Sequence, residues 1–159
     1  MSQQGVSFVY WLGQAFVVGI GWYVVHRLSR SRDLDKARRD MVTKSADAVL
    51  LQVNDLLLQG RSYHTCERDL DREIRVKLSL QDLALQVNAT GELAQSARYA
   101  AACRSELLAF RRAMTFRHFE DEHIDPIPAD DPLLEAVAEH ADRLKRTLLR
   151  LKAAQFMGE

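Results

Sequence analysis

The sequence predicts an all-α protein, in which one N-terminal transmembrane helix is followed by a four-helix antiparallel bundle. Three observations carry this prediction. Residues 6–25 form an uncharged run, long enough as a helix to cross the roughly 30 Å apolar core of a bilayer. Apolar residues after it recur at helical spacing, and no window alternates as a strand does. The predicted division is an anchor over residues 1–28 and a bundle over residues 29–159.

The flanks of the uncharged run indicate how it would be oriented. Tyr10, Trp11, Trp22 and Tyr23 lie toward its two ends, where aromatic rings favour the membrane interface. Basic residues follow the run directly, beginning at Arg27, whereas the five residues before it carry no charged side chain. The positive-inside rule therefore predicts a single-pass protein of the inner membrane, with its N-terminus outside and its bundle in the cytoplasm. A cleaved signal peptide is disfavoured, because its basic residues would precede the apolar run.

The first two bundle helices are expected over about residues 33–59 and 63–89. Gly60 is predicted to end the first, because glycine accepts a left-handed backbone, and Ser62 to cap the second. The first apolar stripe is Met41, Val42, Ala46, Val49, Leu50, Val53, Leu56 and Leu57. The second begins with Tyr63, Cys66, Leu70, Ile74 and Leu78, and toward the C-terminal end Leu80, Leu83, Leu85 and Val87 widen its apolar face. That end is expected deeper in the bundle or in a subunit contact. The charged run between Cys66 and Leu78 is interpreted as a solvated face with ion pairs one turn apart.

The third and fourth helices are expected over about residues 92–116 and from Pro132 onward. Gly91 is predicted to separate the third helix from the second. Asp131 and Pro132 form a helix start, because aspartate caps and proline suits the first turn. The third stripe is Ala100, Cys103, Leu107, Phe110 and Met114, and the fourth is Leu134, Val137, Ala141, Leu144, Leu148 and Leu151. Steps of three and four residues in the fourth stripe are those of a heptad seam.

The composition excludes several function classes. The formal net charge is zero, with 22 basic and 22 acidic residues, so no uniformly basic surface for nucleic acid is expected. The composition does not decide whether the protein binds nucleic acid directly. No glycine-rich phosphate loop or nucleophile elbow is present. The acidic and histidine residues of segment 118–125 match no standard metal spacing, and the two cysteines have no CxxC partner. We therefore predict no cofactor and no metal, and conventional enzyme chemistry has little support.

One short pattern points to a catalytic alternative. Arg112 and His118 are separated by five residues, which resembles the Arg-x4-6-His signature of HEPN domains, a family of small helical bundles. The resemblance implies a ribonuclease in which arginine and histidine from two chains meet. Arg111 is a further candidate, because it shares the helical face of His118. The bland alternative is that Arg111 and Arg112 pair with acidic residues of a neighbouring helix.

Architecture extends this resemblance to the whole chain. An N-terminal membrane helix, a helical bundle and a degenerate Arg…His motif together resemble the membrane-anchored HEPN-like accessory proteins of type VI CRISPR systems. That family implies antiviral defence through an oligomeric membrane pore. Small and polar residues that would serve helix packing or pore lining lie within the apolar run: Gly13, Gln14, Ala15, Gly19 and Gly21.

Three functional hypotheses follow from the sequence. The first is an oligomeric, membrane-anchored bundle that permeabilises the inner membrane as an accessory effector in antiviral defence. The second is a membrane-tethered HEPN-like ribonuclease. The third is a membrane scaffold that recruits a cytoplasmic protein or ribonucleoprotein partner. Expected partners are accordingly the membrane and further copies of the same chain.

Overall fold

The computed structural model describes residues 3–115, 119 and 125–157, with the backbone alone at residues 3–15, 17 and 18. Helices account for most of them: α1 (Gln3–Thr65), α2 (Leu70–Ala94), α3 (Ala97–Met114) and α4 (Pro132–Met157). The chain divides into two compact units, Met1–Arg38 and Arg39–Glu159. The boundary predicted between residues 28 and 29 stays a prediction. The described residues form no strand, as expected for an all-α chain.

The membrane-spanning part of the predicted fold is wrong. Across the described residues, no helix combines the length and the apolar character needed to cross a membrane. Helix α1 carries Phe16 and residues 19–25 as described apolar positions, and then continues through His26, Arg27 and Arg30 without ending. The single-pass inner-membrane location with an outside N-terminus is contradicted by the same finding.

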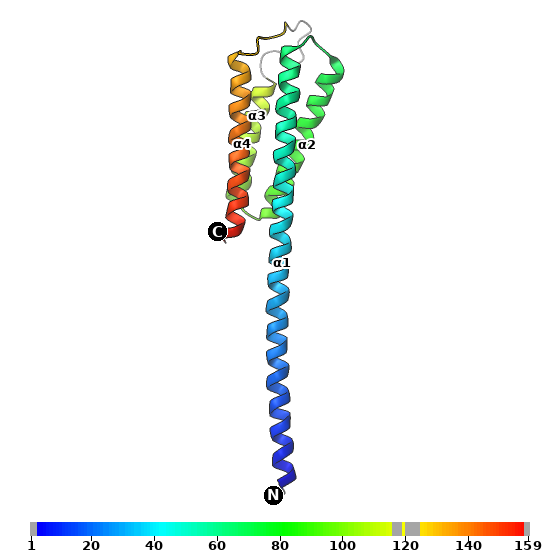
Figure 1. The fold of residues 1–159 in the computed structure, drawn as a ribbon, viewed down its shortest axis with the longest axis vertical. Helices are drawn as coiled ribbons and strands as arrows, with labels where there is room; N and C mark the ends of the chain where they lie inside the picture. Colours follow the sequence, from blue (N-terminus) through cyan, green and yellow to red (C-terminus); the bar gives the residue numbers. More distant parts are fainter. Residues whose placement is uncertain (1–2, 116–118, 120–124, 158–159) are drawn as a thin grey trace. The chain divides into compact units, whose positions relative to one another are not determined.

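The unit Arg39–Glu159 is a four-helix bundle, as predicted. Neighbouring helices run in opposite directions (Figure 1). Side-chain hydrogen bonds between α1 and α2 follow this antiparallel order, because Ser45 bonds to Thr90 at 2.6 Å and Gln52 donates to Asp82 at 2.7 Å. An ion pair between Asp47 and Lys152 joins α1 to α4.

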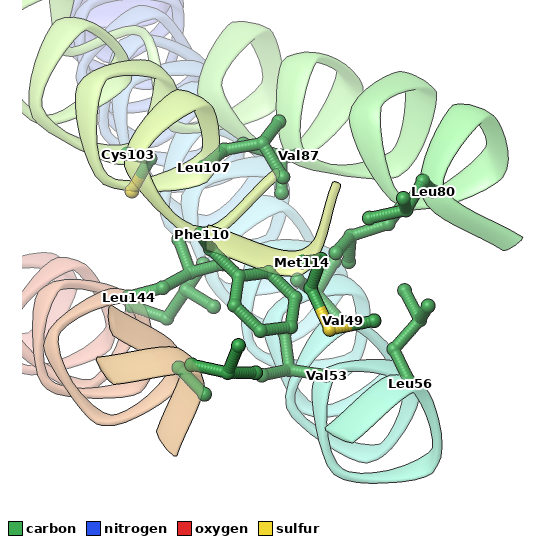
Figure 2. Close-up of a cluster of buried hydrophobic side chains, with 14 of the residues drawn as sticks. Val49, Val53, Leu56, Leu80, Val87, Cys103, Leu107, Phe110, Met114 and Leu144 are labelled. Carbon is green, nitrogen blue, oxygen red and sulfur yellow. The ribbon is translucent and has the colours of Figure 1, made fainter. Parts of the chain in front are cut away.

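The bundle core is built from the stripes that the sequence predicts on α1, α3 and α4. Figure 2 shows Phe110 of α3 at the centre of the cluster, with Val53 of α1 and Leu144 of α4 close by. All three side chains are fully buried. The prediction that Met41 lies in the core of α1 is wrong, because about half of its surface is exposed.

Helix α2 buries the later part of its predicted apolar face, as expected for Leu80, Leu83 and Val87, and leaves the first part exposed. Its core residues are Val76, Leu80, Leu83 and Val87. Leu70, Ile74 and Leu78, which were expected inside, are exposed by 61%, 52% and 58%. The helix therefore has two apolar faces, and only one of them is covered by the bundle.

The predicted ends of the first two bundle helices are wrong. In both, a glycine that was expected to stop the helix lies inside it. Helix α1 continues through Gly60 to Thr65, and Gly60 is buried beneath Met114. Helix α2 likewise continues through Gly91, which packs on Ala100 of α3. In both places the missing side chain permits a close helix approach. Helix α2 ends at Ala94, and its C-cap residue Gln95 adopts the left-handed conformation with φ of 51°.

Aspartate caps mark the starts of α2 and α4. Asp69 accepts hydrogen bonds from the backbone nitrogens of Asp71 and Arg72, so α2 begins at Leu70 rather than after Ser62. Asp131 accepts from the backbone nitrogen of Leu133 at 2.8 Å. The predicted start of the fourth helix at Asp131 and Pro132 is confirmed.

Candidate functional site

The predicted catalytic residues lie at or beyond the C-terminal end of α3. Arg111 and Arg112 occupy its last turn, and both side chains are exposed. Within the described part of the chain, neither guanidinium forms an ion pair, so the acidic partners considered for them are not found there. His118 lies outside the described residues. The structure therefore leaves the Arg…His pairing untested.

A histidine that the sequence analysis passed over connects this end of the bundle. His64, near the end of α1, is 1% exposed, and its Nε2 lies 3.1 Å from the backbone oxygen of Met114. Because a carbonyl oxygen can only accept, Nε2 carries the proton. The backbone oxygen of His64 accepts from the nitrogen of Ile127 at 2.9 Å. His64 thus ties α1 to the end of α3 and to the segment before α4, which is a structural role.

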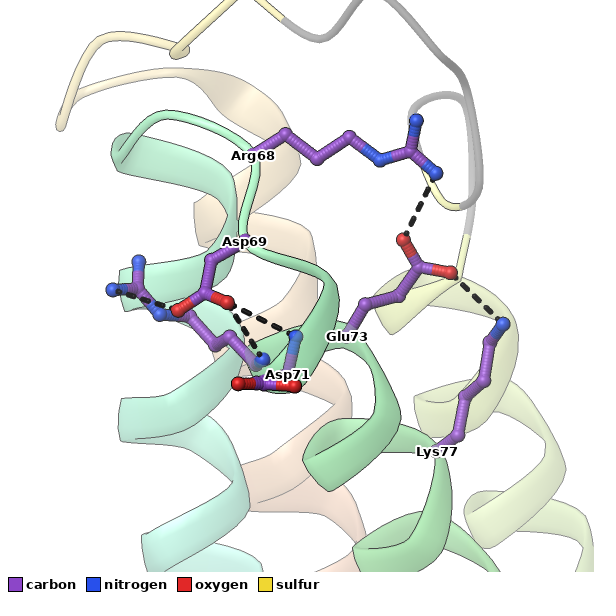
Figure 3. Close-up of polar contacts among 6 residues, drawn as sticks. Arg68, Asp69, Asp71, Glu73 and Lys77 are labelled. Atoms are coloured by element: carbon purple, nitrogen blue, oxygen red, sulfur yellow. Dashed lines mark hydrogen bonds and ion pairs between the residues drawn. The ribbon is translucent and has the colours of Figure 1, made fainter.

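The charged run at the start of α2 contains one buried carboxylate. Glu73 is 5% exposed and lies between Lys77, at 2.9 Å, and Arg68, at 3.5 Å (Figure 3). The Lys77 ammonium also lies 5.6 Å from the centre of the Phe119 ring. Two cations compensate the single buried charge, so this cluster fastens the α2 start to its surroundings. The predicted solvated face holds for the exposed Asp71 and Arg75 but not for Glu73.

Other candidate chemistry is sparse among the described residues. Of the acidic segment 118–125, only Phe119 and Asp125 are described, and the described His, Cys, Asp and Glu residues form no group of three that could hold a metal. Burial, and secondarily the charge of Glu106, raise the pKa of the Cys103 thiol to about 11. A thiol held protonated in this way is a poor nucleophile.

The proposed packing residues of the N-terminal run are only partly described. Gly13, Gln14 and Ala15 fall within α1, where the structure describes only their backbone. Gly19 and Gly21 are open, since a Cβ atom at either position would meet nothing within 4 Å. No described residue packs on these two glycines, so their role in helix association stays a prediction.

Two shallow cavities mark the bundle surface. One, of about 310 Å³, has Leu57, Leu134 and Val137 among its apolar lining and Arg61 and Glu135 among its charged lining. The other, of about 350 Å³, follows the α2–α3 connection around Gly91 and Ser96. Both are open to solvent, and neither encloses a converging set of catalytic groups.

The most distinctive surface feature is the uncovered apolar face of α2. Leu70, Ile74, Leu78 and Leu85 form it, and we call these four residues the α2 outer stripe. Leu85 is 69% exposed, so every member is more than half exposed. At 100° per residue the four positions fall within about 80° of one another around the helix axis. A row of large apolar side chains on one helix face is typical of a protein-binding surface.

Comparison with known proteins gives no independent guide to this surface. No family model, no curated protein and no solved structure matches the chain.

Proposed function

We propose that this protein is a non-catalytic assembly module, whose helical bundle binds another protein chain through the α2 outer stripe. The observation that carries this proposal is the second apolar face of α2. The bundle core is already complete without it, since Val76, Leu80 and Leu83 are buried on the opposite side. Four large aliphatic side chains that lie outside the core are unfavourable when they face water, and such exposed patches mark interaction sites.

The energetic scale favours a partner that is itself apolar. Removing the four side chains from water contributes on the order of 4–7 kcal/mol, given their partial exposure. Association costs roughly 4–15 kcal/mol before any contact is counted. The α2 outer stripe therefore holds a partner only when that partner adds a comparable apolar surface.

We also propose that the module acts in antiviral defence, as the HEPN-like resemblance implies. An accessory protein of antiviral defence acts by assembling, with itself or with a ribonucleoprotein, and an exposed helix face serves that purpose. Binding through the α2 outer stripe requires no membrane span.

A site-specific cross-linking experiment in cells tests the proposal. A photo-crosslinking amino acid, benzoylphenylalanine, replaces Leu78 of the α2 outer stripe in the full chain. The matched control places it at Leu51, which is 68% exposed on α1. We expect protein adducts from position 78 and not from position 51. Absence of adducts at position 78, or equal adducts at both, contradicts the proposal.

A ribonuclease is the second candidate function. It is favoured by two observations: Arg111 and Arg112 are both exposed, and neither forms an ion pair with a described residue. Free guanidinium groups can stabilise the charge that develops on a phosphate during RNA cleavage. Purified protein is incubated with labelled single-stranded RNA. Cleavage that is lost in both Arg112→Ala and His118→Ala would favour this candidate over the assembly module.

A further inference from the structure

We propose that the partner of the α2 outer stripe is a second copy of this chain, bound so that the two α2 helices lie antiparallel across a two-fold axis. This inference rests on the proposed function and names the occupant of the same surface. Two-fold pairing requires a self-complementary surface, in which each contact made by one copy is repeated by the other. The outer face of α2 meets that requirement in its apolar residues and in its charges.

The apolar positions match one another when the helix direction is reversed. If Leu78 faces Gln81 of the second copy, the same register places Ile74 opposite Leu85 and Leu70 opposite Ala89. Each of these positions is exposed in the single chain. Every large member of the α2 outer stripe then meets a residue of the other copy, and none is left facing water beyond the end of the contact.

The charges along one edge of the stripe fit the same register. Arg75 and Asp82 are seven residues apart, which is two helical turns, so they lie on the same edge. In an antiparallel pair, equivalent edges of the two helices adjoin. Arg75 then lies within about 3 Å, measured along the axis, of Asp82 of the second copy. The two-fold axis repeats this pairing, so two opposite-charge contacts lie along the same edge of the apolar contact.

Both charged groups are available for this role. The Arg75 guanidinium is 65% exposed, and its nearest carboxylate, Asp69, is 4.0 Å away. Asp82 is exposed and accepts hydrogen bonds from the neutral amides of Gln52 and Gln86, at 2.7 and 2.9 Å. These two amides hold the Asp82 carboxylate in position for a cation from outside. In a parallel pair each edge adjoins the opposite edge of the other helix, so Arg75 and Asp82, which share one edge, would not meet each other.

The first test measures the molar mass of the full chain by light scattering and sedimentation equilibrium. We expect a mass of at least two chains for the wild type at tens of micromolar. Ile74→Ser with Leu85→Ser should lower the association constant at least tenfold. Leu51→Ser with Leu58→Ser, at equally exposed positions of α1, should leave it unchanged. A monomeric wild type, or equal effects of the two pairs, overturns the inference.

A charge exchange tests the edge contact. Arg75→Glu and Asp82→Arg should each weaken association severalfold, and the double variant should recover most of the loss. Arg143→Glu on α4, where Arg143 pairs within its own chain with Glu139 at 2.6 Å, is the matched control and should not alter association. Failure of the double variant to recover rejects this register.

Cysteine cross-linking tests the helix direction independently of affinity. One variant carries Ile74→Cys and the other Leu85→Cys, both with the exposed Cys66 replaced by serine. Oxidation by copper–phenanthroline and oxygen should join the two variants when they are mixed. Neither variant should cross-link to itself, because equivalent positions lie about 16 Å apart along the axis in this register. Self-cross-linking without mixed product indicates parallel pairing and overturns the inference, as does the absence of any product.

The photo-crosslinking experiment at position 78 distinguishes failure of this inference from failure of the proposed function. Adducts from position 78 that have the mass of two chains support both. Adducts to other proteins alone leave the assembly module standing and reject self-pairing. Circular dichroism of every variant confirms that the helices are intact before these comparisons are made.

Discussion

The thioether end of Met114 lies directly against the backbone of Gly60, in the space that a side chain at that position would occupy. Both residues are buried, so the sulfur of α3 fills a gap that the glycine leaves on α1. This contact brings the ends of α1 and α3 together next to the His64 hydrogen bond to the same methionine.

A methyl group at Gly60 should therefore destabilise the bundle. Alanine gains about 1 kcal/mol of helix propensity over glycine, but overlap in a packed core costs roughly 1–3 kcal/mol. We expect Gly60→Ala to lower the free energy of unfolding by about 1 kcal/mol. In the Met114→Leu background, whose shorter side chain vacates the space, the same change should be neutral or stabilising. Urea denaturation of the four chains of this cycle measures the coupling, and strict additivity would contradict the contact.

The hydroxyl pair between α1 and α2 gives a second prediction. Thr90 is fully buried and donates to the backbone oxygen of Gln86 at 2.8 Å, so it accepts from Ser45. Thr90→Val should cost about 1–2 kcal/mol, since the Ser45 hydroxyl then loses its partner. Ser45→Ala should cost less, because Thr90 keeps its bond to Gln86. Thermal unfolding followed by circular dichroism should show this order, and the reverse order would argue against the assigned donor.

The pKa of Cys103 makes stability depend on pH in the alkaline range. Burial raises the pKa of this thiol from 9.0 to about 11, so the native state keeps a proton that the unfolded chain loses. The resulting stabilisation is complete below pH 9 and is lost as the pH rises toward 11, by about 2–3 kcal/mol in all. The measurement is urea denaturation at pH 7, 9 and 10.5.

Tyrosine and lysine residues titrate in the same range, so the comparison with Cys103→Ala isolates the thiol. The stability difference between the two chains should shrink between pH 9 and 10.5. A difference that is constant with pH would show that the thiol has no raised pKa.

The heptad seam of α4 provides a severe test of the core. Leu144 is fully buried, and Leu144→Asp would place a carboxylate among aliphatic side chains at a cost of several kcal/mol. Leu149→Asp is the control on the same helix, because Leu149 is half exposed and should tolerate the change within about 1 kcal/mol. Differential scanning calorimetry compares the two, and similar melting temperatures would mean that the seam is not in the core.

The sequence predicts α3 and α4 well, because a single apolar stripe marks each of them. Cys103, Phe110 and Leu144 are buried as their spacing requires. Asp131 and Pro132 also place the α4 start correctly, because a cap is a local interaction that the sequence carries in full.

Periodicity fails where tertiary packing decides. Helix α2 carries two apolar stripes, and the sequence does not say which faces the bundle. Burial of the charged Glu73 on the core side, matched by Arg68 and Lys77, makes the other stripe look like the better core. Gly60 and Gly91 resemble helix stops by residue type, yet their use for close packing depends on Met114 and Ala100, which come from another helix.

The candidate site was predicted less well than the fold. His118 lies outside the described residues, so its pairing with Arg112 is not tested. The α2 outer stripe was visible as an apolar pattern at Leu70, Ile74 and Leu78 but was assigned to the interior. The uncharged run before Val25 was interpreted as a membrane span from its length, whereas no described helix has the apolar character required.

The close approach of Gly91 to Ala100 has a consequence for the order of folding. Only Gln95 and Ser96 lie between α2 and α3, so these helices meet after the shortest loop closure in the bundle. Local contacts of this kind form before those that join distant parts of a chain. We expect the α2–α3 hairpin to be the first tertiary structure to assemble, with α1 and α4 docking onto it afterwards.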